Sequence, residues 1–367
     1  MEMRTKVDQK LFLCLCLILL FVTFMCGCAT PKVEGPAPPS PGKVEAPAPS
    51  PPGKVVAPAP PSPRLEARVF PDFIAVITQQ GDTLTSLAAK YLNDSSMDWF
   101  IAEYNGLSAL KPGQALIIPI KPYERGGLTL KGYQLVPVLS YHNFSRDRST
   151  NRMMVTEAAF EEQMRFLLDN GYRVITLNQL TDFLNFKGQI PKKSVVITID
   201  DGWRSAYDIA FPILKKYGYP ATLFVYTDLI VGSEKTLSWE LVHEMARNGL
   251  DIQGHTKTHR KLTLMKSNES FKGYFEALEG ELSKSAGTIK SKAGKDIQYL
   301  AYPEGETNHL VIELAQKEGY LAAFTAKRGG NPFFIHNYRI NRSMIYGDFN
   351  LSQFEKNLTV FSDEALK

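Results

Sequence analysis

The sequence predicts an α/β protein, with a parallel sheet or barrel preceded by a small βααβ unit. Short apolar strands alternate with helical patterns from residue 135 to residue 324, as they do in parallel α/β proteins. Within this region, Val195–Gly202 reads Val-Val-Ile-Thr-Ile-Asp-Asp-Gly, a β-branched run that ends on two adjacent carboxylates. A run without polar alternation is typical of a buried parallel strand, and the carboxyl ends of such strands are where these folds carry their chemistry.

Length and charge limit the classes of function. The chain has 367 residues, enough for two folded domains, and its net charge of +4 is not concentrated in a basic run on any segment expected to fold. Nucleic-acid binding is therefore not supported. The cysteines are Cys14, Cys16, Cys26 and Cys28. Because all of them precede the expected domains, we expect no disulfide framework and no Cys-ligated zinc in the folded part.

Residues 1–27 are interpreted as a lipoprotein signal peptide. Basic residues precede an apolar block from Leu11 to Met25, which has the length of a secretory signal. The block closes on Met-Cys-Gly-Cys-Ala, which resembles a bacterial lipoprotein box with Cys28 as the lipidated residue. Cys26 is the alternative lipidated residue, and an ordinary export signal with incidental cysteines is the alternative interpretation. A lipid on Cys28 would anchor the protein to a membrane, although the sequence leaves open which membrane.

Residues 28–69 are predicted to form a disordered tether rich in proline and alanine. The stretch from 31 to 63 is dominated by Pro, Ala, Gly and Ser, and a Lys-Val pair recurs in it every 11 residues. This composition cannot bury a core and favours an extended, polyproline-type spacer. The tether would let the folded part act at a distance from the membrane, and a spacer without any length requirement is the alternative.

Residues 70–122 are predicted to form the βααβ unit. We expect strands at Ile74–Ile77 and Ala115–Pro119, with helices at Leu84–Tyr91 and Trp99–Tyr104 between them. The Gly-Asp-Thr-Leu before the first helix, the Asn-Gly after the second and the Lys-Pro-Gly-Gln before the last strand resemble a LysM domain. This resemblance implies binding of glycans that contain N-acetylglucosamine, peptidoglycan first. By family position, the binding groove would include Gly81, Asp82, Thr83, Asn105 and Gly106.

Two acids and two histidines later in the chain are the candidate catalytic residues, and an aspartate with two histidines is a metal-ligand set. Asp200 and Asp201 end the central strand, and the segment His255–His259, His-Thr-Lys-Thr-His, follows another short strand. Adjacent carboxylates repel each other unless a cation or proton lies between them. The segments Thr198–Gly202 and His255–His259 resemble the first two motifs of the NodB-type polysaccharide deacetylases, carbohydrate esterase family 4. The resemblance implies a distorted, incomplete (β/α) barrel, which we expect over residues 132–350.

The same resemblance implies the role of each residue. Asp201, His255 and His259 would hold a divalent metal, which in this family is usually zinc. Asp200 would be the general base. The third motif is only partly present. Pro303 and Gly305 remain, so the backbone N–H of Glu304 is the expected oxyanion donor. Ala301, however, replaces the family arginine that orients the base. This departure resembles the branch that contains poly-N-acetylglucosamine deacetylases.

His142 is the expected general acid. It follows the first strand of the catalytic region, and an imidazole near its ordinary pKa can protonate a leaving amine. The late Leu-x-His motif that supplies this acid in other branches does not occur between Phe324 and Lys367, where His336 is interpreted as structural. A histidine that merely caps a loop is the alternative for His142.

Together these features predict an enzyme, a metal-dependent hydrolase that removes N-acetyl groups from N-acetylglucosamine units of a cell-envelope polysaccharide. The LysM resemblance favours peptidoglycan, whereas the third motif favours poly-N-acetylglucosamine, and we lean toward peptidoglycan. The protein would be exported and lipid-anchored, in the periplasm or at the outer membrane, with no protein partner. One alternative is a non-catalytic glycan-binding lipoprotein with a degenerate deacetylase fold, for which Ala301 is the main support. Another is a hydrolase of O-acetyl groups.

Overall fold

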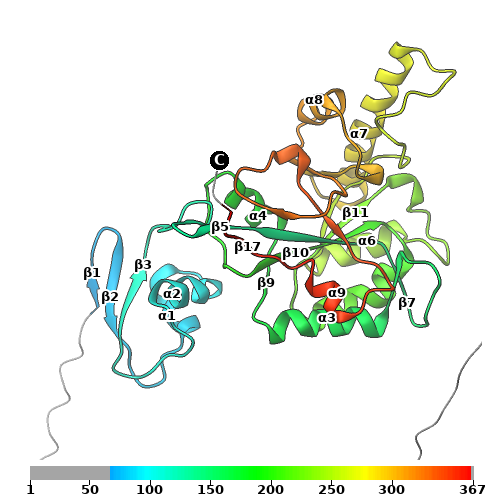
Figure 1. The fold of residues 1–367 in the computed structure, drawn as a ribbon. Helices are drawn as coiled ribbons and strands as arrows, with labels where there is room; N and C mark the ends of the chain where they lie inside the picture. The colour runs from blue at the N-terminus through cyan, green and yellow to red at the C-terminus, as the bar shows by residue number, and fades with distance from the viewer. Residues whose placement is uncertain (1–66, 365–367) are drawn as a thin grey trace, which may run out of the picture. The chain divides into compact units, whose positions relative to one another are not determined.

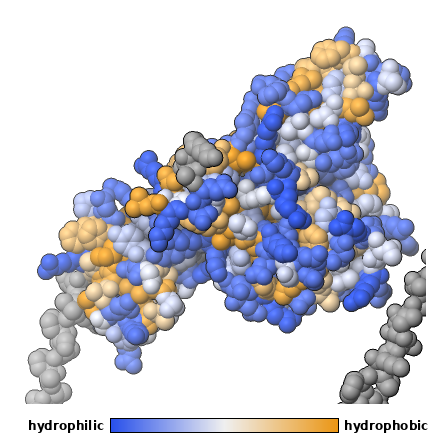
Figure 2. All heavy atoms as spheres, viewed as in Figure 1, coloured by the Kyte–Doolittle hydropathy of each residue, from blue (hydrophilic) through white to orange (hydrophobic). Residues whose placement is uncertain are grey.

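The computed structural model describes residues 67–364, which form a small N-terminal unit and a larger α/β unit (Figure 1). The predicted signal peptide, Cys28 and the tether up to residue 66 lie outside the described residues. Among the helices of residues 67–364, none is both long and apolar enough to span a bilayer. The face seen in Figure 2 is mostly hydrophilic, with apolar residues scattered over it.

The N-terminal unit is an antiparallel sheet covered on one face by two helices. The strands β2 (Phe73–Ile77) and β3 (Ala115–Pro119) flank α1 (Leu84–Leu92), a short 3-10 turn (Ser95–Met97) and α2 (Asp98–Asn105). This confirms the predicted order of elements. The residues that alternate toward the helices form the core, among them Ile74, Val76, Leu116 and Ile118.

One additional strand precedes this unit. The strand β1 (Arg68–Val69) pairs with β2, so the prediction of a disordered tether as far as residue 69 is wrong at its end. A two-residue strand is too short to produce a periodic pattern. It forms because the backbone groups along the free edge of β2 can be paired there.

The larger unit is a curled, mostly parallel sheet surrounded by helices, which confirms the predicted incomplete barrel. Its strand order is β14-β13-β12-β11-β10-β6-β15. The parallel strands are β6 (Val136–Tyr141), β10 (Ser194–Asp201), β11 (Thr222–Val225), β12 (Asp251–Gly254), β13 (Tyr299–Ala301) and β14 (Ala322–Phe324). The helices between and after them are α3 (Glu157–Asp169), α4 (Leu177–Leu184), α5 (Phe211–Tyr217), α6 (Trp239–Arg247), α7 (Phe271–Ala293) and α8 (His309–Lys317).

The gap between the two edges of this sheet is crossed by residues 340–344. Ile340 forms a parallel bridge with Phe324 of β14, and β16 (Ser343–Met344) pairs with β6. β15 (Gly330–Asn331) lies antiparallel to β6, and β9 (Arg173–Val174) lies parallel to β10. Residues 340–344, which we call the closing segment, therefore hold the half-barrel in its curl.

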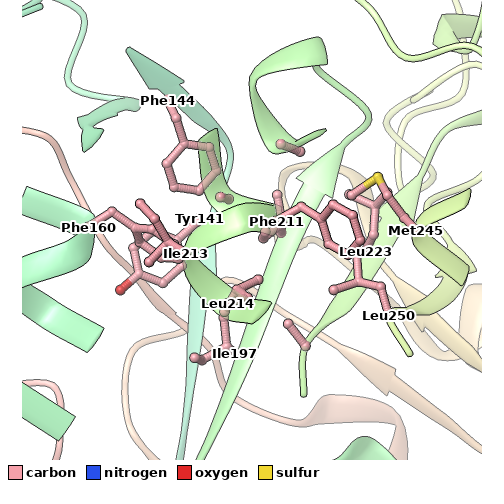
Figure 3. Close-up of a cluster of buried hydrophobic side chains, with 14 of the residues drawn as sticks. Tyr141, Phe144, Phe160, Ile197, Phe211, Ile213, Leu214, Leu223, Met245 and Leu250 are labelled. Atoms are coloured by element: carbon pink, nitrogen blue, oxygen red, sulfur yellow. The ribbon is translucent and has the colours of Figure 1, made fainter. Parts of the chain in front are cut away.

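The central strand divides its side chains between two cores. Val195, Ile197 and Ile199 face outward into a cluster shared with α3, α5 and α6, part of which is shown in Figure 3. Val196 faces inward into a second cluster, which includes residues of α4. Because side chains alternate along a strand, Thr198 and Asp200 share the inner face with Val196.

The unit extends beyond the predicted limits of 132 and 350. The strand β17 (Phe361–Ser362) pairs with β5 (Gly132–Gln134), which pairs in turn with β4 (Leu128–Thr129). The helix α9 (Leu351–Glu355) packs on α3 through Phe354. A further pair, β7 (Asn143–Ser145) and β8 (Met154–Thr156), leads from β6 into α3. These pieces are short, so their burial is decided by the elements they meet rather than by a pattern of their own.

A half-buried acid, Asp251, lies at the amino end of β12, away from the strand ends that carry the motifs. Asp251 accepts hydrogen bonds from Gln253 Nε2 at 2.9 Å and from Thr222 Oγ1 at 3.3 Å. Burial outweighs these hydrogen bonds and raises the pKa of the Asp251 carboxyl. The ionised form of Asp251 therefore opposes folding.

We predict that Asp251→Asn stabilises the protein at pH 7. The folded state holds the Asp251 proton more tightly than the unfolded chain does, so stability falls as the pH rises from about 3.9 through the folded pKa. The gain in the free energy of unfolding should be full above that range and should vanish below it. Urea unfolding over a pH series measures the gain, with the exposed Asp296→Asn as the control. A gain independent of pH would refute this explanation.

Candidate active site

The predicted catalytic residues converge at the carboxyl edge of the sheet. The strand register places Ile199 beside Tyr141, Asp201 beside Val225, and Val225 beside Gly254, so the residues that end these strands lie in one row. A cavity of about 300 Å³ opens there. It is lined by Ser140, His142, Met153, Asp200, Asp201, His255, His259, Tyr302, Glu304, Gly305, Ala326, Arg342 and Met344.

Asp201, His255 and His259 form a group that fits a divalent cation. Their ligand atoms lie within 4.8 Å of one another. Asp201 Oδ1 is 3.7 Å from His255 Nε2 and 3.8 Å from His259 Nε2, too far for hydrogen bonds. Ligands about 2.0–2.1 Å from a tetrahedral zinc ion lie roughly 3.4 Å apart, so small adjustments would place all three around one ion. With three protein ligands, one position would stay open for water or substrate.

Unusual backbone conformations place these ligands. Asp201, Thr256 and His259 have φ values of 79°, 69° and 62°, in the left-handed region that residues other than glycine seldom adopt. Strand alternation would direct Asp200 and Asp201 to opposite faces of the sheet, and the left-handed turn at Asp201 ends this alternation. Both carboxylates consequently line the same cavity. Such strain concentrates at functional sites.

The imidazole of His255 is oriented by the backbone. Its Nδ1 lies 2.7 Å from the carbonyl oxygen of Ala301, which can only accept a hydrogen bond. The proton is therefore on Nδ1, and the lone pair of Nε2 faces Asp201 and His259. Burial lowers the pKa of His255, so the ring is neutral at pH 7 and available as a ligand. Ala301 thus contributes through its carbonyl group although it lacks the side chain found in other branches.

The loop that carries His259 is held by a buried acid that the sequence analysis missed. Glu281 of α7 accepts hydrogen bonds from Lys257 N at 3.0 Å, Thr258 N at 2.8 Å and Thr258 Oγ1 at 2.7 Å. His259 N in turn donates to Thr256 Oγ1. Glu281 lies within a long helix and has no motif around it. The sequence offered one signal for this role, a charged residue among the residues on the buried face of α7.

Asp200 is buried against an arginine that the sequence analysis also missed. Arg342 Nη1 donates to Asp200 Oδ1 at 2.7 Å, and the two residues are only 2% and 1% exposed. Arg342 Nε donates to the carbonyl of Thr325, which fixes the guanidinium. Burial would raise the pKa of Asp200, but the guanidinium of Arg342, with His255 and His142 nearby, outweighs it and lowers this pKa to about 2. Arg342 therefore stands where the missing family arginine would be needed.

His142 and Glu304 lie in the cavity, whereas His336 is not among its lining residues in the described chain. His142 Nε2 is 3.9 Å from Asp200 Oδ2. Glu304 has a φ of 57° and is therefore a further left-handed position in the site, which turns its peptide. His336 precedes a 3-10 turn and accepts a hydrogen bond from Tyr338 N through Nδ1.

The residues proposed for glycan binding in the N-terminal unit shape its turns and helix ends. Thr83 caps α1 by accepting from Ser86 N, and Asp82 Oδ2 accepts from Gln79 N at 2.7 Å. Gly81 and Gly106 have positive φ, and Gly106 ends α2. The backbone N–H groups of Asp82, Thr83 and Gly106 are also paired within the unit, because they donate to the Gln79 carbonyl, to Ser86 Oγ and to the carbonyls of Ala102 and Glu103.

Both polar atoms of the Asn105 side chain form hydrogen bonds within the N-terminal unit. Its Nδ2 donates to the carbonyls of Ile101 and Ile117, at 2.8 and 2.7 Å, and its Oδ1 accepts from Ile117 N at 3.0 Å. The side chain ties the end of α2 to β3. Any contribution of Asn105 to binding is therefore expected to come from its backbone or from the shape of the loop that follows.

We predict that Arg342→Met destabilises the protein by about 3–5 kcal/mol at pH 7, because it leaves the Asp200 carboxylate buried without a partner. The loss should shrink as the pH falls, since the unpaired Asp200 will take up a proton. Urea unfolding measures both effects. The double variant Asp200→Asn, Arg342→Met should recover much of the stability. If the double variant is no more stable than Arg342→Met, the loss comes from packing rather than from charge.

Comparison with known proteins identifies both units. Residues 187–323 match the family model described as Polysaccharide deacetylase, and residues 76–119 match the LysM domain. A poly-beta-1,6-N-acetyl-D-glucosamine N-deacetylase of Staphylococcus epidermidis is 32% identical over 211 residues, 56% of this chain and 72% of that protein. The protein YxkH of Bacillus subtilis is 30% identical over 214 residues, 57% of this chain and 72% of its own length. The Streptococcus pyogenes deacetylase PplD, solved with acetate, shares the fold, with a TM-score of 0.56 and 24% identity over 62% of this chain and 99% of that one.

Proposed function

This chain belongs to the polysaccharide deacetylase family, and on that premise we propose that it hydrolyses N-acetyl groups from N-acetylglucosamine units of a cell-envelope polysaccharide with the help of a divalent metal. One observation carries the proposal. Asp201, His255 and His259 lie in one cavity with the buried, ionised Asp200. A carboxylate beside a vacant ligand position is the arrangement that metal-assisted hydrolysis requires.

Zinc is the proposed metal, with Asp201, His255 and His259 as its ligands. One carboxylate and two neutral imidazoles are a ligand set typical of catalytic zinc. A bound zinc ion would acidify a water molecule and polarise the acetyl carbonyl. The observation behind this choice is the chemistry of the donors together with the tautomer that Ala301 imposes on His255.

Asp200 is proposed to accept the proton of the attacking water. Arg342 keeps the carboxylate ionised and holds its Oδ1, which leaves Oδ2 toward His142 and Ser140. A pKa of about 2 makes Asp200 a weak base, so the water must itself be acidic for this transfer to be efficient. The low pKa also means that Asp200 stays charged throughout the neutral and mildly acidic range.

His142 and Glu304 are proposed to complete the site. The imidazole of His142, which lines the same cavity as the metal ligands, would give a proton to the leaving amine. The backbone N–H of Glu304, in its left-handed turn, would donate to the oxygen that becomes negative during attack. His142 Nε2 and Asp200 Oδ2 lie 3.9 Å apart, so a small side-chain movement would bring them within hydrogen-bond distance and let Asp200 return its proton to His142.

The LysM unit and the N-terminus are proposed to hold the enzyme near its substrate. A LysM unit that binds glycan raises the local concentration of acetylated sugar at the catalytic unit. A lipid on Cys28 and the tether, both outside the described residues, would keep the protein in the envelope. The staphylococcal relative is named for poly-N-acetylglucosamine, whereas LysM favours peptidoglycan, so both polymers belong in the test. The non-catalytic alternative rests on Ala301, and the presence of Arg342 beside Asp200 weakens it.

We predict that the full-length protein releases acetate from N-acetylglucosamine polymers, that a chelator stops this release, and that zinc restores it. Acetate should be measured with peptidoglycan and with poly-N-acetylglucosamine in parallel, and with an O-acetylated glycan as the third substrate. Asp201→Asn, which keeps the shape of a ligand but removes its charge, should lose nearly all activity.

Asp228→Asn is a suitable control, because Asp228 is an exposed acid that pairs with Lys257 outside the cavity. Activity that survives the chelator would refute the proposed dependence on a metal. No release from any substrate by a folded protein that still binds glycan would favour the non-catalytic alternative. Release from the O-acetylated glycan alone would show that the enzyme cleaves an ester rather than an amide.

We predict that His142→Asn lowers kcat by roughly 10²–10⁴-fold, the usual contribution of a positioned general acid. Zinc content should not change, because His142 is not among the proposed ligands. His336→Asn is the matched control and should retain activity, because His336 does not line the cavity. Equal kcat values for His142→Asn and the wild type would exclude His142 as the acid.

A further inference from the structure

Trp203 lies directly behind the proposed metal ligand Asp201. Its indole Nε1 donates a hydrogen bond to Asp201 Oδ2 at 2.9 Å. The other oxygen, Oδ1, is the one that faces His255 and His259. We propose that Trp203 is a positioning residue that fixes the carboxylate of Asp201 and thereby strengthens metal binding. This inference rests on the metal site proposed above.

The two carboxylate oxygens of Asp201 have different neighbours, and this difference supports the proposal. A free carboxylate can rotate about its Cβ–Cγ bond and present either oxygen, or both, to a cation. The indole N–H engages Oδ2 and leaves Oδ1 directed at the two imidazoles. Because the indole is neutral, it orients the carboxylate without neutralising the charge that attracts the cation. Hydrogen bonds of this kind to metal ligands typically change metal affinity by 10–100-fold.

The backbone around Trp203 is itself held in place. Gly202 has a φ of 116°, and a Cβ at this position would lie 2.4 Å from Ile230 Cδ1. Leu237 N donates to the carbonyl of Gly202, and Trp203 forms an isolated antiparallel bridge with the buried Thr236. Residues 202–204 are thus paired with residues 235–237. The indole therefore approaches Asp201 from a fixed backbone rather than from a free loop.

Trp203 is not placed to bind substrate. Among the described residues that line the cavity, Asp201 is present and Trp203 is absent. Its indole N–H is engaged by Asp201 Oδ2, so the contact that it makes with the site passes through that carboxylate. We therefore expect Trp203 to act through Asp201 rather than by contact with the glycan.

Zinc affinity in full-length protein tests this inference, measured by competition with a fluorescent zinc chelator. Trp203→Phe keeps a ring but removes the donor, whereas Trp203→Gln keeps an N–H donor but removes the ring. We expect Trp203→Phe to bind zinc about tenfold or more weakly than the wild type, and Trp203→Gln to bind more tightly than Trp203→Phe. Trp239→Phe makes the same chemical change at the start of α6 and should bind zinc like the wild type.

The outcomes separate this inference from the proposed function. If the wild type binds one zinc ion and Trp203→Phe binds it equally well, the positioning role of Trp203 is overturned while the metal site stands. If Trp203→Gln binds more weakly than Trp203→Phe, the ring rather than the donor matters, and the inference is again overturned. If the wild type binds no zinc, the metal site fails and Trp203 has no metal ligand to position. Unfolding midpoints of the metal-free variants show whether any loss of affinity is a loss of folding.

Discussion

The buried ion pair between Arg342 and Asp200 is the interaction on which the rest of the catalytic unit depends. Arg342 belongs to the closing segment that joins β14 to β6, and Asp200 ends the central strand β10. A buried charge is costly unless it is paired and hydrogen-bonded, so the burial of each residue depends on the charge of the other. The same contact therefore completes the half-barrel and keeps the proposed base ionised.

The side of the cavity that carries Asp201, His255 and His259 is built differently, from strained backbone whose side chains are held by neighbouring residues. The left-handed residues Asp201, Thr256 and His259 direct side chains where a regular strand or turn would not. Each ligand segment then has an outer partner that limits its movement. Trp203 holds Asp201, the Ala301 carbonyl holds His255, and Glu281 holds the loop of His259. A strained backbone conformation of this kind persists only when several contacts in the surrounding structure hold the residue in place.

The two units contribute different kinds of specificity. The cavity, with a volume of about 300 Å³, has the size for a small group such as the acetyl amide of the proposed substrate, and its size does not require a particular polymer. In the proposed function, the LysM unit supplies affinity for a glycan without taking part in the chemistry. A family likeness in the catalytic unit and a family likeness in the binding unit can therefore point to different polymers without conflict, because the polymer that is bound and the polymer that is cut need not be the same.

The sequence by itself determined the longer strands, most helices, the order of the units and the residues that gather at the carboxyl edge of the sheet. It could do so because these features depend on short-range patterns, such as the β-branched run before Asp200 and the spacing of His255 and His259. Only the tertiary structure decided the partners of those residues. Arg342 lies 142 positions from Asp200, Glu281 lies 23 positions from Thr258, and even Trp203, two positions from Asp201, meets it only through a left-handed turn. No local pattern encodes such contacts, because they form where separate elements are packed together.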